Sequence, residues 1–197
     1  LAVASLWSFT SFMLHISTSP EQALMWNSIL VVVMMWSMVC YYHFARSYTN
    51  KPAGIWLYIG YVYLLALAAL SLNGYIVKSA YVVVGVLFHD LGNSLYLIGA
   101  ANLFYVFSVL FLLVRRYRSS TDHIDRNRTM YLISGWGVLV LFGYTNLLPA
   151  VAGLPLDHIG ALLNAIVISY AIFRYQLLNI RLVARTALSY ALLIVIC

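Results

Sequence analysis

Histidines and carboxylates are the side chains of this sequence that could support the most varied chemistry. Six of them fall in three polar segments that the charge distribution below places on one side of the molecule: His15, Glu21, His89, Asp90, Asp157 and His158. Imidazole and carboxylate groups can hold a metal ion, and histidine can change its charge near neutral pH. No HxH or HxxxH spacing joins the histidines, however. His15, His89 and His158 are therefore a candidate metal or pH-sensing site, and the simpler interpretation is that they are interfacial polar residues.

Uncharged polar side chains inside the apolar segments form a second group. We expect most of them, including Asn27 and Asn102, to form hydrogen bonds between helices, each worth roughly 0.6–2 kcal/mol in a membrane. The alternative is a ligand pocket of aromatic and amide side chains. The candidates for its lining are Trp136, Tyr144, Asn146 and Asn164. The small residues Ala161, Ala165 and Ser169 recur at helical spacing, which favours close packing against a neighbouring helix.

The sequence contains no motif of a soluble enzyme active site. It has no P-loop, no GxSxG, no HExxH and no glycine-rich nucleotide fingerprint. Cys40 and Cys197 lie in apolar stretches without CxxC or Cys/His zinc spacing, so we interpret them as small packing residues. We predict no catalytic residue and no cofactor in this chain.

Long apolar segments must position these side chains. Of 197 residues, 64% are apolar and only 8% are charged, whereas about 25% are charged in an ordinary soluble domain. A membrane-spanning helix needs about 20 mostly apolar residues. Runs of this kind cover 1–16, 23–44, 54–72, 91–114, 129–148 and 156–173, and another begins near 186. We predict an all-α, polytopic transmembrane bundle of about seven spans, with the first and last cut short.

The connection from Asn73 to Asn93 is the longest on its side of the bundle. Its central part is rich in β-branched residues and is too short for a span. Asn-Gly and Gly-Asn pairs flank it. We expect either an extended hairpin or interfacial flap over this end of the bundle, or a partly embedded coil.

Basic residues are confined to alternate connections. All of the 11 lysines and arginines except Lys78 fall in the loops after the second, fourth and sixth runs. Cytoplasmic loops of membrane proteins carry such an excess of basic residues, so we place these three loops in the cytoplasm. The net charge of +6 therefore reflects membrane topology and does not indicate a nucleic-acid-binding surface.

The second to sixth runs contain no charged residue between their ends, Asp157 lying at the entrance of the sixth. A charge at mid-bilayer costs about 2.5–3.5 kcal/mol on insertion scales and is retained mainly where a function needs it. Proton pumps, ion-coupled transporters and voltage sensors normally keep such charges. The pattern argues against these classes and leaves a sensor possible, since a sensor needs only two packings of similar energy.

The stretch from Tyr170 to Arg185 reads YAIFRYQLLNIRLVAR. It resembles the YAI-x-RY-x-LL-x-I-x-x-V-x-R stretch that ends the seven-transmembrane N-terminal region of bacterial sensor histidine kinases. Three further segments are similar to that family: RNR at 126–128, YLISG at 131–135 and NLLP at 146–149.

The resemblance implies that the first six runs are the second to seventh helices of the family region, with a further helix after them. It also implies a homodimer whose soluble part holds the phosphoacceptor histidine and an ATP-binding domain. No histidine of this chain matches a phosphoacceptor motif.

The expected organisation is a sensor bundle over 1–175, a cytoplasmic interfacial connector over 176–185 and the start of another transmembrane helix over 186–197. The candidate signal-coupling residues are Arg174, Tyr175, Leu177, Leu178, Ile180, Arg181 and Arg185. Arginine at a helix end snorkels to the headgroups, and the apolar spacing of the connector fits a helix lying on the surface. Such a segment either transmits movement of the sixth helix or simply anchors the topology.

We therefore expect a multi-pass protein of the inner or plasma membrane, in contact with the lipid bilayer. The favoured function is the sensory region of a bacterial signalling protein, most simply a histidine kinase, with a cytoplasmic output module in the same polypeptide. A cyclic-dinucleotide synthase with the same input region is a close variant. The alternatives from other classes are a small-molecule transporter and an intramembrane metal-dependent hydrolase that uses the three histidines.

Overall fold

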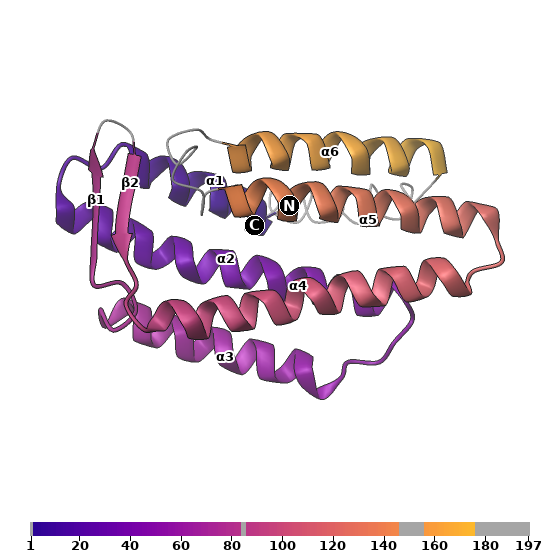
Figure 1. The fold of residues 1–197 in the computed structure, drawn as a ribbon, viewed down its shortest axis with the longest axis horizontal. Helices are drawn as coiled ribbons and strands as arrows, with labels where there is room; N and C mark the ends of the chain where they lie inside the picture. Colours follow the sequence, from indigo (N-terminus) through magenta and orange to yellow (C-terminus); the bar gives the residue numbers. More distant parts are fainter. Residues whose placement is uncertain (1, 84–85, 146–155, 176–197) are drawn as a thin grey trace, which may run out of the picture.

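The computed structural model describes residues 2–83, 86–145 and 156–175. The elements are α1 (Ala2–His15), α2 (Pro20–Tyr48), α3 (Ile55–Leu72), β1 (Ser79–Val83), β2 (Val86–Asp90), α4 (Ser94–Ser119), α5 (His123–Tyr144) and α6 (Leu156–Tyr175). Consecutive helices run in alternating directions along the molecule (Figure 1). The prediction of a helical bundle is thus confirmed, and the run expected from 186 onward lies outside the described residues.

Four helices are long and apolar enough to cross a membrane, namely α2, α3, α4 and α6. The described part of α1 has only 14 residues. Helix α5 has 22 residues, but Asp125, Arg126 and Arg128 occupy its first two turns and lower its hydropathy. Length and composition therefore support four spans within the described residues, not the seven that we expected.

Polar side chains define where two of the helices begin. The hydroxyl of Ser19 accepts a hydrogen bond from the amide of Gln22 at the start of α2. The carboxylate of Asp122 accepts hydrogen bonds from the amides of Ile124 and Asp125, at 3.1 and 3.3 Å, and so caps α5. Each cap satisfies backbone donors that a helix leaves free at its first turn.

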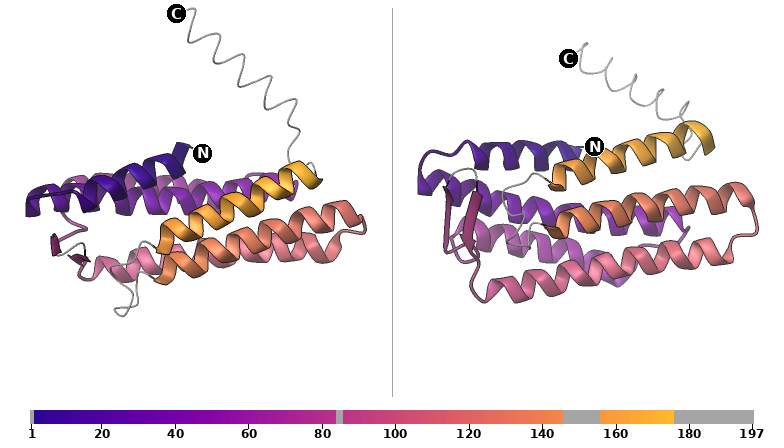
Figure 2. Two further views of the ribbon diagram at one scale, coloured as in Figure 1. Left: turned by 90° about the horizontal axis from the view of Figure 1, so that it is seen from above. Right: turned by 45° about the horizontal axis from the view of Figure 1, so that its top comes forward.

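Helix α2 lies at the centre of the bundle and contacts α1, α3, α4 and strand β1. Met35 and Val39 of α2 are completely buried there, and the ring of Tyr42 packs edge-on against Tyr105 of α4. Helices α5 and α6 form a second antiparallel pair that joins this group mainly through α4 (Figures 1 and 2), with further side-chain contacts to α2.

The outer surface of the bundle is unusually apolar. Leu65 of α3, Phe107 of α4 and Leu162 of α6 expose 74%, 63% and 62% of their surface. Large contiguous apolar surfaces are rare on soluble monomers, whereas hydrocarbon solvates them at no cost. This distribution agrees with a protein whose helices are surrounded by lipid.

The connection between α3 and α4 contains a β-hairpin. Strands β1 and β2 pair antiparallel, with Ser79 opposite Asp90. The hairpin lies transversely across one end of the bundle (Figure 1), where Ile76, Val77 and Ala80 are buried and β1 contacts α2. This confirms the hairpin expected from the sequence.

Charged residues divide between the two ends of the bundle. We call the end away from the hairpin the basic end. It contains the last turns of α2, α4 and α6 and the first turns of α5 (Figure 1), and its described cations are Arg46, Lys51, Arg115, Arg116, Arg118, Arg126, Arg128 and Arg174. Lys78 lies at the hairpin end.

Candidate signal-coupling site

The candidate metal-binding histidines have local partners where their side chains are described. The Nδ1 atom of His15 lies 2.8 Å from the carbonyl oxygen of Ser11 in its own helix. His158 lies 3.0 Å from the carboxylate of its neighbour Asp157. The side chain of His89 lies outside the described part of the structure. Among the described residues, no three His, Cys, Asp or Glu side chains come together as metal ligands.

The three candidate pocket residues that the structure describes do not form one group. Trp136 packs against Tyr41 of α2, with ring centroids 4.5 Å apart, and Asn164 donates a hydrogen bond of 3.3 Å to the Tyr41 hydroxyl. Tyr144 lies elsewhere and contacts Asn102, while Asn146 is outside the described residues. The indole N–H of Trp136 and the amide oxygen of Asn164 have no hydrogen-bond partner among the described residues.

Asn102 forms a buried polar contact among three helices. The hydroxyl of Tyr144 in α5 donates a hydrogen bond of 2.6 Å to the Oδ1 atom of Asn102 in α4. The Nδ2 atom of Asn102 lies 3.9 Å from the sulfur of Met35 in α2. Asn102 is only 8% exposed, so these contacts replace the water that the amide loses on burial. This confirms the expected interhelical role of Asn102.

Two glycines allow α5 and α6 to approach closely. A Cβ atom on Gly135 of α5 would lie 2.5 Å from the amide oxygen of Asn164. On α6, a Cβ atom on Gly160 would lie 2.4 Å from the Cβ of Phe142. A larger side chain at Gly160 must push the helices apart, whereas one at Gly135 must displace the side-chain amide of Asn164. The stripe of Ala161, Ala165 and Ser169 is instead exposed, so it is not the face that packs against α5.

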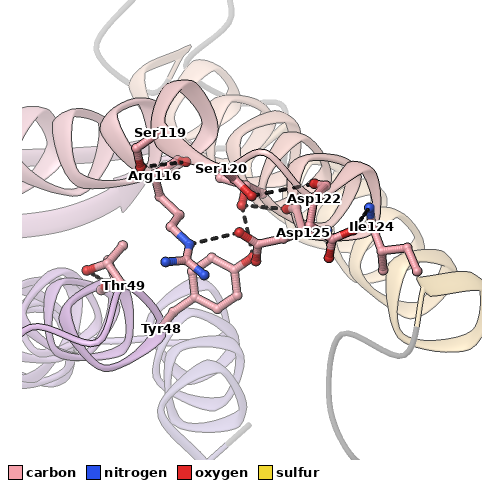
Figure 3. Close-up of polar contacts among 10 residues, drawn as sticks. Tyr48, Thr49, Arg116, Ser119, Ser120, Asp122, Ile124 and Asp125 are labelled. Atoms are coloured by element: carbon pink, nitrogen blue, oxygen red, sulfur yellow. Dashed lines mark hydrogen bonds and ion pairs between the residues drawn. The ribbon is translucent and has the colours of Figure 1, made fainter.

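At the basic end, helices α2, α4 and α5 meet in a polar junction. The guanidinium of Arg116 in α4 forms an ion pair of 2.9 Å with Asp125 in α5 (Figure 3). The hydroxyl of Thr129, one turn further along α5, lies 2.9 Å from the hydroxyl of Tyr48 in α2 and donates to the carbonyl of Asp125. Thr129 is fully buried. The first turns of α5 thus hold both α2 and α4.

The surroundings of Asp125 stabilise the charged form of its carboxyl group. Burial by itself would raise the pKa of its carboxyl. The hydroxyl of Ser120 and the guanidinium groups of Arg116 and Arg128 outweigh burial and lower the pKa below its usual value. Asp125 therefore remains ionised and suited to an ion pair.

The same segment of α5 also holds the last turn of α6. The Nε atom of Arg128 donates a hydrogen bond of 2.5 Å to the backbone carbonyl of Tyr175. The ring of Tyr131, also in α5, lies 5.3 Å from the ring of Tyr175 and 5.4 Å from that of Tyr170. A cation at a helix C-terminus stabilises the free carbonyls and the helix dipole.

The structure therefore places two of the seven candidate signal-coupling residues. Tyr175 is held by α5, while the side chain of Arg174 is exposed at the basic end. The other candidates, Leu177, Leu178, Ile180, Arg181 and Arg185, lie outside the described residues.

The partners on α5 could not be recognised from the sequence, because Arg128 and Thr129 look like ordinary helix-start residues. The similarity of segment 126–128 to a known family was the one signal near them.

Comparisons with known proteins identify the family of this chain. No curated protein and no solved structure matches the chain. A protein-family model described as the N-terminal 7TM region of histidine kinase matches residues 1–181. Since the match covers all six described helices, the chain belongs to the family of N-terminal 7TM regions of histidine kinases.

Proposed function

We propose that this bundle senses a stimulus and relays it to a kinase module in the same polypeptide by moving α6 relative to α5. The observation that carries the proposal is the hydrogen bond from Arg128 to the carbonyl of Tyr175. It fixes the last described residue of α6, directly before the expected connector at 176–185. Family membership supports a kinase module on that side.

The polar junction gives this movement a defined route. Helix α5 contacts α2 through Thr129, α4 through Asp125 and α6 through Arg128. A stimulus that favours a second packing of α5 would therefore reposition the end of α6 at the same time. The stimulus must bind the two packings unequally, because a ligand with equal affinity for both shifts nothing.

The proposal places the protein in the plasma membrane with several spans and its basic end in the cytoplasm. The arginine-rich ends of α4 and α5 support this orientation. Residues 176–185, including Leu177, Leu178 and Ile180, then form the connector between bundle and output module. A homodimer and a bacterial two-component system complete the proposal, on the basis of the family.

Autophosphorylation of the full-length protein in membrane vesicles tests the relay. We expect Arg128→Gln to change basal or stimulated phosphorylation about two- to thirty-fold, the range given by coupling energies of 0.5–2 kcal/mol. The control is Arg126→Gln, because Arg126 lies in the same turn but its side chain has its partner among the described residues in Tyr117 of the preceding helix, not in α6. Equal phosphorylation by the wild type and both variants would contradict the proposal.

A further inference from the structure

The outward face of α4 combines a long apolar stripe with two arginines at the basic end. Phe107 and Phe111 each expose 63% of their surface, and Phe104 exposes 39%. Arg115 and Arg118 follow on the same helix and are also exposed. Spacings of three and four residues place all five side chains on one face of a helix.

The two arginines differ from the other cations of α4 and α5. Arg116 is paired with Asp125, Arg128 donates to the carbonyl of Tyr175, and Arg126 lies over the ring of Tyr117 at 4.9 Å. Arg115 and Arg118 have no hydrogen-bonding, ionic or aromatic partner among the described residues. Two free guanidinium groups therefore border an exposed apolar surface.

The dimensions of this face fit a lipid molecule. Phe107 and Arg115 are eight residues apart, which corresponds to about 12 Å along a helix. Guanidinium groups bind phosphate through paired hydrogen bonds, and the phenylalanine rings offer an apolar surface for the adjoining acyl chain. We propose that Phe107, Phe111, Arg115 and Arg118 bind an anionic phospholipid of the leaflet at the basic end.

A second copy of the chain fits this face less well. An isologous contact presents the same patch from both subunits, so pairing through this face would gather four arginines. Like charges at one contact repel each other. The lipid proposal rests on the membrane placement in the proposed function, which the following experiment tests separately.

The experiment is native mass spectrometry of the purified full-length protein in detergent, titrated with phosphatidylglycerol and, in parallel, with phosphatidylcholine. The wild type should bind phosphatidylglycerol more tightly. Because a basic residue near an anionic lipid surface contributes about five-fold in affinity, Arg115→Gln should weaken binding about five-fold and Arg115→Gln/Arg118→Gln about 25-fold. Both side chains are exposed, so the variants should fold normally.

The charge-matched control is Lys51→Gln/Arg126→Gln, which removes two cations from the basic end but leaves the α4 face intact. It should retain wild-type affinity for phosphatidylglycerol. Equal losses in both double variants would overturn the site by showing a nonspecific charge effect, and so would unchanged affinity in both. A change in the monomer–dimer ratio of the α4 variant with unchanged lipid affinity would also overturn it, because the face would then contact a second copy.

Reconstitution separates this site from the proposed function. Protein that inserts into liposomes and resists carbonate extraction, but shows no preference for phosphatidylglycerol, contradicts the lipid site alone. Protein that carbonate removes from the liposomes contradicts the membrane placement and the lipid site together.

Discussion

Single polar side chains hold this bundle together where apolar packing cannot distinguish one arrangement from another. In lipid, the hydrophobic effect does not drive helices together, so hydrogen bonds and close packing decide their register. Asn102 contacts α2 and α5 from the interior of α4. Asp125 and Thr129 perform the same task near the water boundary.

Removal of the Tyr144 hydroxyl should measure the interior contact. We expect Tyr144→Phe to lower the free energy of unfolding by about 1 kcal/mol, because Asn102 loses a buried hydrogen bond within the bundle. Denaturant titration in micelles measures the change. Tyr96→Phe is the control, since Tyr96 is 78% exposed and should be nearly neutral. Equal effects of the two substitutions would contradict this role of Tyr144.

The Arg116–Asp125 ion pair should make stability depend on pH in the acid range. Because folding lowers the pKa of Asp125, its contribution is fully present above the unfolded-state pKa and is lost as the pH falls through the folded-state value. We therefore expect the wild type to be more stable than Asp125→Asn at neutral pH and the difference to shrink below about pH 4.

Unfolding titrations of both proteins between neutral and acid pH provide the measurement. Arg116→Gln should reduce the pH-dependent part of the difference, since it removes the paired cation. A difference between wild type and Asp125→Asn that stays constant across this range would contradict the assignment.

At the level of helices, α5 and α6 are held at short distance by glycines that face the neighbouring helix. Gly135 lies against Asn164, and Gly160 lies against Phe142. The small-residue stripe of Ala161, Ala165 and Ser169, one residue further round α6, is exposed. The close approach allows Tyr175 to come within reach of Arg128 and Tyr131, so helix spacing and the coupling contact depend on each other.

A methyl group at the α5–α6 interface should therefore disturb both stability and coupling. We expect Gly160→Ala to destabilise the bundle by about 1–3 kcal/mol, because its Cβ would lie 2.4 Å from the Cβ of Phe142, which moves only with its backbone. Gly137→Ala is the matched control, since a Cβ there meets no atom within 4 Å. It should be neutral or stabilising by up to about 1 kcal/mol. Thermal unfolding in micelles distinguishes the two; equal melting temperatures would contradict the tight contact.

At the scale of the whole molecule, the two ends of the helical bundle differ in charge. The basic end gathers the cations of α2, α4, α5 and α6, and the hairpin closes the other end (Figure 1). A membrane potential and anionic inner-leaflet lipids both favour cations on the cytoplasmic side. Orientation is therefore a property of the complete bundle and not of any one helix.

Cysteine labelling in whole cells should reveal this orientation. With Cys40 and Cys197 replaced by alanine, Asn73→Cys should react with an impermeant maleimide added outside, because Asn73 is exposed at the hairpin end. Thr121→Cys, exposed in the α4–α5 turn, should react only after the membrane is permeabilised. The reverse pattern would contradict the orientation, and labelling of both from outside would contradict alternate crossing.

The sequence by itself determined the number and approximate limits of the described helices. Apolar runs 54–72 and 23–44 correspond to α3 at Ile55–Leu72 and α2 at Pro20–Tyr48. The longer extent of α2 has a simple reason, because a helix continues past the hydrocarbon boundary wherever caps and polar side chains satisfy its ends. The β-branched residues and flanking glycines also indicated a hairpin, but they left a partly embedded coil open until the pairing of β1 with β2 decided between the two.

Only the tertiary structure decided which polar residues meet. Tyr48 and Thr129 are 81 residues apart, and Arg128 and Tyr175 are 47 apart. Hydropathy fixes which segments enter the membrane, but it does not fix the rotation and axial shift of one helix against another. Those depend on the fit of individual side chains, such as Asn164 against Gly135, which exists only when the helices are packed.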